Sequence, residues 1–341
     1  MWEGELKKMK KRVFALLLAG ALCAGLAACG QSTQDTTAAA DTAAEADTEA
    51  AASEDAEAAD TEAADAAETT GSGKVTVYMP SPAGLADKLA EAFTAETGIQ
   101  VEQFQGTTGE ILARLETEAA NPVADVVILA SWSDGLTMKE DGQIMSYTPA
   151  NADLVNEGWI DEDSMLFGYS ASAVGVIYNT TIYPELSADW ADLAGADYTD
   201  DIAIPDPEKS GACKDFLAGM VTGLDNGEEI MQSWADNGLT VPGANSAALE
   251  SVTTGEKGIL IAGVDYNAYS SMADGEPLSI YYPASGTVVN PRPAMIMNTA
   301  PNVDNAKAFI DFLFSDEAQQ MVADAYLLPG RSDIQCDGRT N

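Results

Sequence analysis

The stretch Asp125-Val126-Val127-Ile128-Leu129, which continues as Ala130-Ser131-Trp132-Ser133-Asp134, decides the fold of this chain. Its first part is a short apolar run, which is typical of a parallel strand buried on both faces. Its second part is a small polar loop that leads into a predicted helix. A strand, a polar loop and a helix in this order predict one unit of an α/β sheet.

The same unit occurs twice upstream of this stretch. Residues 74–78 alternate apolar and polar side chains, as a strand does, and lead to Ser81, which we expect to cap the next helix. Residues 99–104 form a second predicted strand, and Thr107 and Glu110 then have the spacing of a capping box. Three successive units predict a lobe built on a parallel sheet.

Downstream, the pattern predicts a second α/β lobe and then a return to the first. A further apolar strand is expected at residues 258–263. We therefore expect residues 74–172 to form lobe 1, residues 173–285 to form lobe 2, and residues 286–341 to return to lobe 1.

Residues 1–28 have the features of an export signal. Basic residues at 10–12 precede an apolar run at 13–25, and small residues then lead to Cys29. A cysteine at this place resembles the lipidated cysteine of a bacterial lipoprotein signal; an ordinary secretory signal with a chance cysteine is the alternative. The apolar run is shorter than the roughly 20 residues of a membrane span. We expect a chain on the extracytoplasmic face of the cell membrane, attached only by the lipid on Cys29.

Residues 29–73 are expected to be a disordered acidic tether between this cysteine and the folded lobes. Residues 30–72 contain no Lys, no Arg and no large apolar side chain, so they cannot bury enough surface to offset their conformational entropy. They contribute strongly to the formal net charge of -39. A chain this acidic, without a basic patch, is not expected to bind nucleic acid.

The sequence contains no histidine, which excludes Ser-His-Asp and Cys-His catalysis and removes the commonest zinc ligand. We therefore expect a protein that is not an enzyme and has no cofactor. An exported hydrolase built on Ser-Lys or on carboxylates is the remaining enzymatic alternative, and no spacing suggests one. Besides Cys29, Cys213 and Cys336 remain after export, and their spacing neither supports nor excludes a disulfide.

Small polar residues recur where a predicted strand ends and a helix begins. Helix N-termini carry unpaired N–H groups and a partial positive charge, so they suit small oxyanions. In parallel sheets such loops gather at one edge. The same residues also serve as plain helix caps, so both interpretations stay open for each loop. The candidate ligand-binding residues of this kind are Ser81, Thr107, Thr108, Ser131, Ser210, Gly211 and Asn245.

Asp265 and Tyr266 are candidates of a second kind, because they directly follow the apolar strand at residues 259–261. A charge immediately after a buried run is either a ligand contact or a helix cap. Both interpretations stay open here as well.

Several stretches of the folded part match the pattern of one protein family. They are residues 91–99, 109–115, 121–122, 124–126, 172–176, 178–179, 241–246, 286–289, 307–312 and 329–333. In these stretches the chain resembles the substrate-binding lipoproteins of bacterial ABC importers, in the branch of ferric-iron, phosphonate and sugar-phosphate binders. The resemblance implies a type II periplasmic-binding-protein fold, in which two α/β lobes joined by crossing strands close on a solute. It also implies delivery of this small-molecule solute to an ABC permease with its ATPase, and we expect a monomer. Relatives usually continue with a further C-terminal helix, so the resemblance implies that the segment after Cys336 is a truncated C-terminus.

The resemblance also bears on the ligand. Iron-binding relatives carry paired tyrosines at the position of Asp265 and Tyr266; here Tyr266 matches the second and Asp265 replaces the first. Those relatives often add a histidine, which this chain lacks. The phosphonate and sugar-phosphate relatives agree better with the Ser, Thr and Asn loops, and Ser172, at the start of one matching stretch, joins the candidates. We expect a phosphonate or a sugar phosphate and no metal; ferric iron held by Tyr266 and Asp265 is the alternative. A lipoprotein that signals to a sensor has the same sequence pattern.

Overall fold

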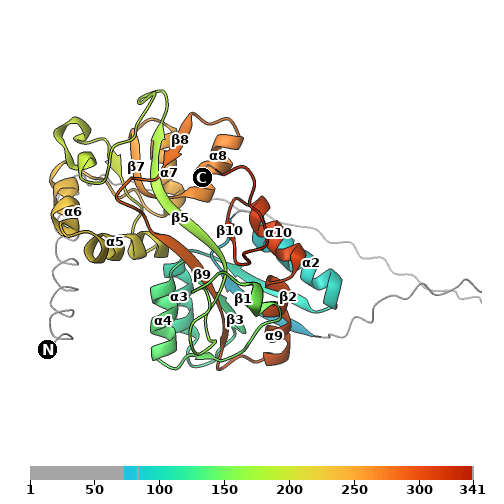
Figure 1. Ribbon diagram of the computed structural model, residues 1–341. Coiled ribbons are helices and arrows are strands. Elements are labelled where there is room, and N and C mark those ends of the chain that lie inside the picture. The colour runs from blue at the N-terminus through green and yellow to red at the C-terminus, as the bar shows by residue number, and fades with distance from the viewer. Residues whose placement is uncertain (1–72, 83, 340–341) are drawn as a thin grey trace, which may run out of the picture. The chain divides into compact units, whose positions relative to one another are not determined.

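The computed structural model describes residues 73–82 and 84–339 (Figure 1). The predicted export signal, Cys29 and the predicted tether up to residue 72 lie outside the described residues. In chain order the helices and strands are β1 (Lys74–Met79), α2 (Leu85–Thr97), β2 (Gln100–Gln105), α3 (Thr108–Glu118), β3 (Val126–Ile128), α4 (Trp132–Glu140), β4 (Ile144–Met145), β5 (Phe167–Asn179), β6 (Ile202–Ala203), α5 (Gly211–Gly223), α6 (Gly227–Asp236), α7 (Asn245–Thr253), β7 (Ile259–Val264), α8 (Asp265–Ala273), β8 (Leu278–Tyr281), β9 (Val289–Met297), α9 (Val303–Leu313), α10 (Asp316–Asp324) and β10 (Leu328–Pro329).

The described strands follow the order β2-β1-β3-β9-β5-β7-β6, with β8 and β10 added to β5 and β4 added to β9. β1 pairs in parallel with both β2 and β3, as the three repeated units predict. β9 pairs antiparallel with both β3 and β5. The mixed α/β fold class is therefore confirmed, and the late strand β9 enters the sheet of the first lobe in the opposite direction.

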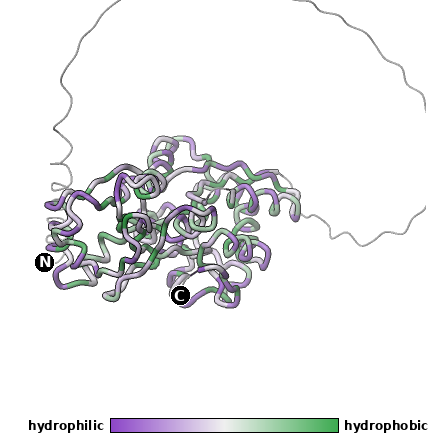
Figure 2. Tube along the Cα trace, turned by 90° about the horizontal axis from the view of Figure 1, so that it is seen from above, coloured by the Kyte–Doolittle hydropathy of each residue, from purple (hydrophilic) through white to green (hydrophobic). Residues whose placement is uncertain are grey.

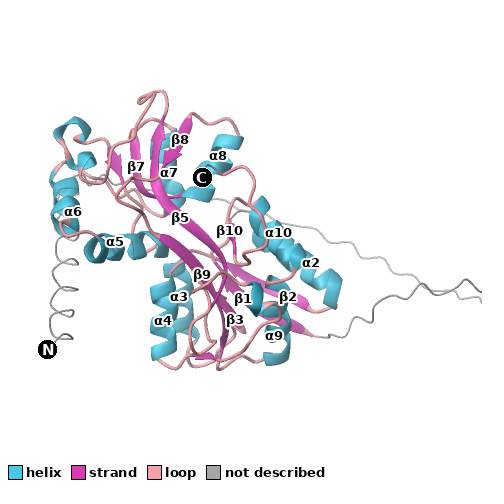
Figure 3. Ribbon diagram, in the orientation of Figure 1, coloured by secondary structure: helices cyan, strands magenta, loops and turns pink. Residues whose placement is uncertain are grey.

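β3 is buried from both sides, which explains its continuous apolar sequence. Val126 and Ile128 pack in the same cluster as Phe93 of α2, whereas Val127 packs with Ile111 of α3. Figure 3 shows α3 and α4 on one side of these strands and α2, α9 and α10 on the other. Because successive residues of a strand point to opposite faces, a strand between two helical layers needs an apolar side chain at every position.

β5 and β9 connect the two lobes (Figure 1). The first half of β5 pairs with β9 and β10, and from Val174 onward β5 pairs with β7 and β8. Lobe 1 comprises β1–β4 with α2–α4, α9 and α10, and lobe 2 comprises β6–β8 with α5–α8. We call β5 and β9 the hinge strands, because a strand shared by two lobes can bend and reorient one against the other.

Hydrophobic and hydrophilic residues are interspersed along the trace (Figure 2), as expected for amphipathic elements. In α2, for example, the side chains of Leu85, Leu89 and Phe93 are buried, whereas Lys88 and Glu91 are exposed. The spacing of four places the apolar residues on one face of the helix. That face packs toward the sheet and α9.

Side-chain caps at three helix starts agree with the sequence. The Thr107 hydroxyl accepts from the N–H of Glu110 at 3.2 Å, and the Glu110 carboxylate accepts from the N–H of Thr107 at 2.8 Å, so the capping box is confirmed. The hydroxyls of Ser131 and Ser210 likewise cap α4 and α5. These three oxygens are therefore already used by their own helices.

The expectation that Ser81 caps α2 is wrong. A turn in which the N–H of Leu85 donates to the carbonyl of Pro82 at 3.1 Å intervenes, and Gly84 takes the N-cap position with a φ of 77°. Gly84 adopts this left-handed backbone without a steric penalty, so the helix begins after the turn and not at Ser81. Asn245 is likewise the first residue of α7 and not its side-chain cap.

Cys213 and Cys336 are both free thiols. The Cys213 thiol donates to the carbonyl of Pro205 at 3.1 Å, and the Cys336 thiol donates to the carbonyl of Ala323 at 3.4 Å. The disulfide that the sequence left open is not formed.

The C-terminal segment contacts both lobes. Arg331, with 5% of its side chain exposed, pairs with Asp316 at 2.6 Å and with Asp333 at 2.7 Å. Arg339 pairs with Asp265 at the start of α8. The segment therefore begins on lobe 1 and ends on lobe 2.

Candidate functional site

The α4–α5 contact joins the two lobes through polar groups. Asp215 of α5 accepts hydrogen bonds from the backbone N–H of Trp132 at 3.0 Å and from the hydroxyls of Ser131, at 3.1 Å, and Ser133. The N-terminus of α4, where the sequence predicted an oxyanion at Ser131, is therefore occupied by a carboxylate of the protein itself.

The α4–α5 contact contains two carboxylates, Asp215 and Asp134, and one lysine, Lys214. Burial raises the pKa of Asp215, the nearby Asp134 acts in the same direction, and the hydrogen bonds from Ser133 and Ser131 oppose this rise. Lys214 pairs with Asp134 at 2.6 Å. The partial positive charge at the start of α4 also favours a carboxylate there. Asp134 is thus paired with a lysine, whereas Asp215 is held by hydrogen-bond donors at the start of α4.

Helix starts of the two lobes approach each other closely at two glycines. A Cβ on Gly211 would lie 2.7 Å from the carbonyl oxygen of Ala130, and a Cβ on Gly109 would collide with the carbonyl of Glu208. Thr108, which is 3% exposed, accepts from the N–H of Ala130 at 3.2 Å. Only glycine allows backbones to come this close, so Gly211 and Thr108 serve packing between and within the lobes.

A second group of polar side chains, which we call the hinge face, lies on β5 and β9. Ser170 stands opposite Arg292, and Ser172 stands opposite Asn290; residues two apart in a strand share a face. None of the four is more than 2% exposed. The amide of Asn290 donates to the carbonyl of Ala212 at 3.3 Å, so the hinge face is directed toward the start of α5.

Several polar atoms around the hinge face lack a partner. The hydroxyls of Ser170 and Ser172 and the Nε of Arg292 are buried and make no hydrogen bond within the described residues. The buried Ser81 hydroxyl is also unpaired, and its loop touches the hinge face where the Pro80 carbonyl accepts from Arg292. A buried unpaired polar group costs about 1–3 kcal/mol. Several such groups at one place are expected where a ligand supplies the missing partners.

Sequence reasoning missed Ser170, Asn290 and Arg292. Arg292 is nevertheless the one charged residue of β9, which otherwise reads Val, Asn, Pro and then mostly apolar residues to Met297. A charge next to an apolar run was the signal that singled out Asp265, and Arg292, which directly precedes the largely apolar residues 293–297, carries the same signal.

Asp265 is fully buried at the start of α8. Its carboxylate accepts from the N–H of Ala173 at 2.9 Å, from the N–H of Tyr266 at 2.8 Å, from the hydroxyl of Tyr282 at 3.2 Å, and from Arg339. Burial raises the pKa of Asp265, and the charge of Arg339 opposes that rise. The carboxylate is thus engaged by donors of the protein.

Tyr266 lies at the hinge face, because its ring is 5.0 Å from the guanidinium carbon of Arg292. Of the predicted candidates, Tyr266 contacts Arg292, Ser81 follows the proline whose carbonyl Arg292 contacts, and Ser172 is two residues along β5 from Ser170, the cross-strand neighbour of Arg292. Asn245 has a buried, unpaired Oδ1 at the start of α7. No hydrogen bond between described residues links Asn245 to the hinge face.

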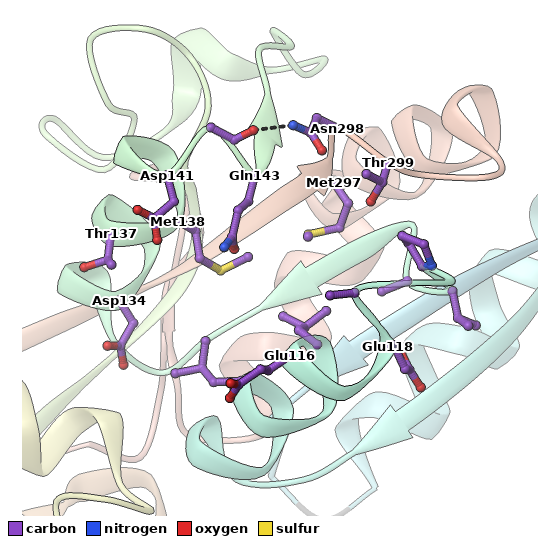
Figure 4. Close-up of a pocket in the computed structure, with 17 residues that line it drawn as sticks. Glu116, Glu118, Asp134, Thr137, Met138, Asp141, Gln143, Met297, Asn298 and Thr299 are labelled. Atoms are coloured by element: carbon purple, nitrogen blue, oxygen red, sulfur yellow. Dashed lines mark hydrogen bonds between the residues drawn. The ribbon is translucent and has the colours of Figure 1, made fainter.

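A surface groove of about 570 Å³ lies on lobe 1 between α3 and α4 (Figure 4). Its lining includes apolar side chains such as Leu112, Met138 and Met297 and carboxylates such as Glu116 and Asp141. No Lys or Arg is among its lining residues, so its electrostatics disfavour an anion. None of the candidate residues predicted from the sequence lines it.

Two further properties concern residues 73–82 and 84–339. No helix in these ranges is long and apolar enough to cross a membrane. Within the same ranges, no group of three His, Cys, Asp or Glu side chains could hold a metal ion.

Two α/β lobes joined by shared strands, with buried polar groups at the junction, define a two-lobe solute-binding protein. The family model described as bacterial extracellular solute-binding protein matches residues 121–338. The chain belongs to this family.

Known proteins similar to this chain carry different ligands in their names. Iron uptake protein A1 of Synechocystis sp. is 28% identical over 280 residues, which are 75% of this chain and 76% of that protein. A putative 2-aminoethylphosphonate-binding periplasmic protein of Salmonella typhimurium is 26% identical over 258 residues, which are 72% of this chain and 73% of that protein.

The fold is also that of solved binding proteins. The periplasmic binding protein AfuA from Actinobacillus pleuropneumoniae, with exogenous fructose-6-phosphate bound, superposes with a TM-score of 0.73 at 20% identity, and the match covers 80% of this chain and 89% of that one. The predicted type II periplasmic-binding-protein fold is confirmed.

Proposed function

We propose that this chain is the extracytoplasmic solute-binding subunit of an ABC importer, and that it delivers a phosphonate or a sugar phosphate to a permease driven by an ATPase. The observation that carries the choice of ligand is the pair of hydroxyls of Ser170 and Ser172, which are fully buried on the hinge face without a partner. Hydroxyls can donate to the several acceptor oxygens of a phosphorus oxyanion.

The start of α5 supplies a second element of the site. The N–H groups of Gly211 and Ala212 come before the first possible intrahelical hydrogen bond. Asn290 holds this helix start to the hinge face through the Ala212 carbonyl at 3.3 Å. A helix N-terminus favours an anion by about 0.3–1 kcal/mol, so the hydroxyls and the helix start select the same ligand charge.

Ferric iron is the alternative ligand, and it would use Tyr266 and Asp265. Against it, the Asp265 carboxylate already pairs with Arg339, and the ring of Tyr266 lies against the guanidinium of Arg292. A cation in contact with Tyr266 repels a metal cation and attracts an anion. The surroundings of both residues therefore support the oxyanion.

A thermal-shift panel tests the proposed ligand class. The folded chain is titrated with 2-aminoethylphosphonate, fructose-6-phosphate, inorganic phosphate and ferric citrate. A ligand that binds only the native state stabilises it by about 2.7 kcal/mol at a hundred times its Kd, so the melting temperature should rise with the concentration of a phosphorus oxyanion. A rise with ferric citrate alone would favour iron. Turnover of any of these compounds to a detected product would contradict a binding protein.

We also propose that Cys29 attaches the chain to the membrane. A diacylglycerol on this cysteine provides two acyl chains, which suffice for stable attachment. In cell fractionation, Cys29→Ala should move the protein from the membrane pellet to the soluble fraction, with Cys23→Ala as the matched control. A Cys29→Ala protein that still pellets after a salt wash would exclude this anchor.

A further inference from the structure

Arg292 is a buried cation without a counter-ion. Its side chain is 1% exposed, and no ion pair to it exists within the described residues. A buried charge is costly unless it is paired. The other described arginines all meet carboxylates: Arg114 pairs with Glu118, Arg331 with Asp316 and Asp333, and Arg339 with Asp265.

The position of Arg292 connects the hinge with both lobes. It lies on β9 opposite Ser170 of β5. Its Nη1 donates to the carbonyl of Pro80, in the loop after β1 of lobe 1, and its guanidinium carbon is 5.0 Å from the ring centre of Tyr266, at the start of α8 in lobe 2. The guanidinium is therefore held at the junction by a carbonyl on one side and a ring on the other, and neither neutralises its charge.

Unpaired donors lie on residues adjacent to this cation in the strand pairing and in the Pro80 loop. The Nε of Arg292 and the hydroxyls of Ser170 and Ser81 are buried without a hydrogen-bond partner in the described chain. Ser170 is the cross-strand neighbour of Arg292, and Ser81 follows the proline whose carbonyl Arg292 contacts. Guanidinium groups bind phosphate and carboxylate oxygens through parallel N–H donors, and adjacent hydroxyls can donate to the remaining oxygens.

We propose that Arg292 binds the anionic phosphoryl or phosphonyl group of the solute, with Ser170 and Ser81 as additional donors. This assignment rests on the proposed function and specifies which end of the ligand lies at the hinge. Because Arg292 contacts both the Pro80 loop and Tyr266, an anion bound there adds contacts next to each lobe. Binding and lobe closure are then driven by the same charge.

Calorimetry on three variants tests this assignment. Inorganic phosphate, 2-aminoethylphosphonate and fructose-6-phosphate are titrated into the wild type, Arg292→Met, Arg292→Lys and the control Arg114→Met, whose arginine pairs with Glu118 at 2.8 Å within α3. Arg292→Met should bind the phosphorus oxyanion about ten- to hundredfold more weakly, because a charge-assisted hydrogen bond is lost. Arg292→Lys keeps the charge but loses the planar fork. Its affinity for the phosphorus oxyanion should therefore lie between those of the wild type and Arg292→Met. Arg114→Met should bind like the wild type.

Melting temperatures of the ligand-free proteins give a second measurement. Removing an unpaired buried charge should leave the melting temperature of Arg292→Met equal to or above that of the wild type. Wild-type affinity in Arg292→Met would overturn the assignment and leave the proposed function standing. A lowered melting temperature in both Arg292 variants would identify a structural arginine and would also overturn it. If the wild type binds none of the three oxyanions, the proposed function fails instead.

Discussion

Two buried arginines in different regions of the molecule have opposite surroundings. In the C-terminal segment, Arg331 is 5% exposed and donates to Asp316, to Asp333 and to the carbonyl of Phe314 at 3.0 Å. On the hinge face, Arg292 is 1% exposed and meets no carboxylate of the described chain. A guanidinium whose bonds are made within the chain fixes the fold, whereas one without a counter-ion is available to a ligand. The exposed fraction therefore does not distinguish a structural arginine from one available to a ligand, whereas the presence of a carboxylate partner does.

The largest effect on stability is expected at the paired arginine. Arg331→Met leaves the buried Phe314 carbonyl without its donor and removes the ion pairs to Asp316 and Asp333, whose side chains are 86% and 45% exposed. The free energy of unfolding should therefore fall by about 2–4 kcal/mol, most of it from the unpaired carbonyl. Urea denaturation measures this, with Arg292→Met as the comparison. If Arg292→Met were the more destabilising of the two, the contrast between the regions would be lost.

The α4–α5 contact extends the comparison to a carboxylate. Asp215→Asn weakens the charge-assisted hydrogen bonds from Ser131, Ser133 and the Trp132 N–H, and it should lower the free energy of unfolding by about 1.5–3 kcal/mol. The control Lys214→Met removes the neighbouring ion pair, whose lysine side chain is 42% exposed, and should cost at most about 1 kcal/mol. Equal losses in both variants would show that Asp215 is no better paired than a surface charge.

Asp161 provides a pH-dependent test of a fully paired group. Burial alone would raise the pKa of Asp161, but hydrogen bonds from Lys139, Leu166 and Met165 outweigh it and lower the pKa. The stabilisation is therefore present above the unfolded pKa of about 4 and is lost as the pH falls through the lower folded value. Asp161→Asn should cost about 1–2 kcal/mol at pH 7, and the difference from the wild type should shrink in acid. A constant difference in denaturation curves from pH 7 to pH 2 would contradict this account.

The smallest effect is expected at an unpaired hydroxyl. Ser172→Ala removes a buried donor that has no partner, so the free energy of unfolding should be unchanged or rise by up to about 1 kcal/mol. Ser251→Ala is the matched control, because its hydroxyl donates to the carbonyl of Ala248 at 2.7 Å, and it should lose about 1 kcal/mol. A clear loss in Ser172→Ala, measured by chemical denaturation, would mean that its hydroxyl has a structural role.

Local sequence features predicted the elements well, because their causes lie within a few residues. The apolar run at 126–128 required a strand with helices on both faces, and Thr107 with Glu110 specified a helix start. Ser81 failed because the next helix start was decided by the Pro82 turn and by Gly84. A capping pattern fails where a turn moves the helix start by a few residues.

The site could be predicted only in part, because it depends on contacts between distant segments. Ser172 and Tyr266 were recognised as single residues. Arg292 could be assigned to the same site only from the strand register, which places it opposite Ser170. Asp215 likewise fills the start of α4 from 83 residues away. Strand register and packing between the lobes decide which polar groups find a hydrogen-bond partner within the protein and which stay unpaired. Neither can be predicted from local sequence spacing.

The ion pair between Arg339 and Asp265 joins the C-terminal segment, residues 331–339, to lobe 2, and we call this segment the strap. Arg331 is fixed to lobe 1 through Asp316, and Arg339 is fixed to the first residue of α8 in lobe 2. The eight residues from 332 to 339 can extend to at most about 26–29 Å, so the strap sets an upper limit on how far the lobes can separate while the ion pair holds. Wider opening must first release Arg339, which leaves the Asp265 carboxylate with neutral donors but without a counter-charge. The amplitude of the hinge and the charge of the cleft are thereby controlled by one removable contact.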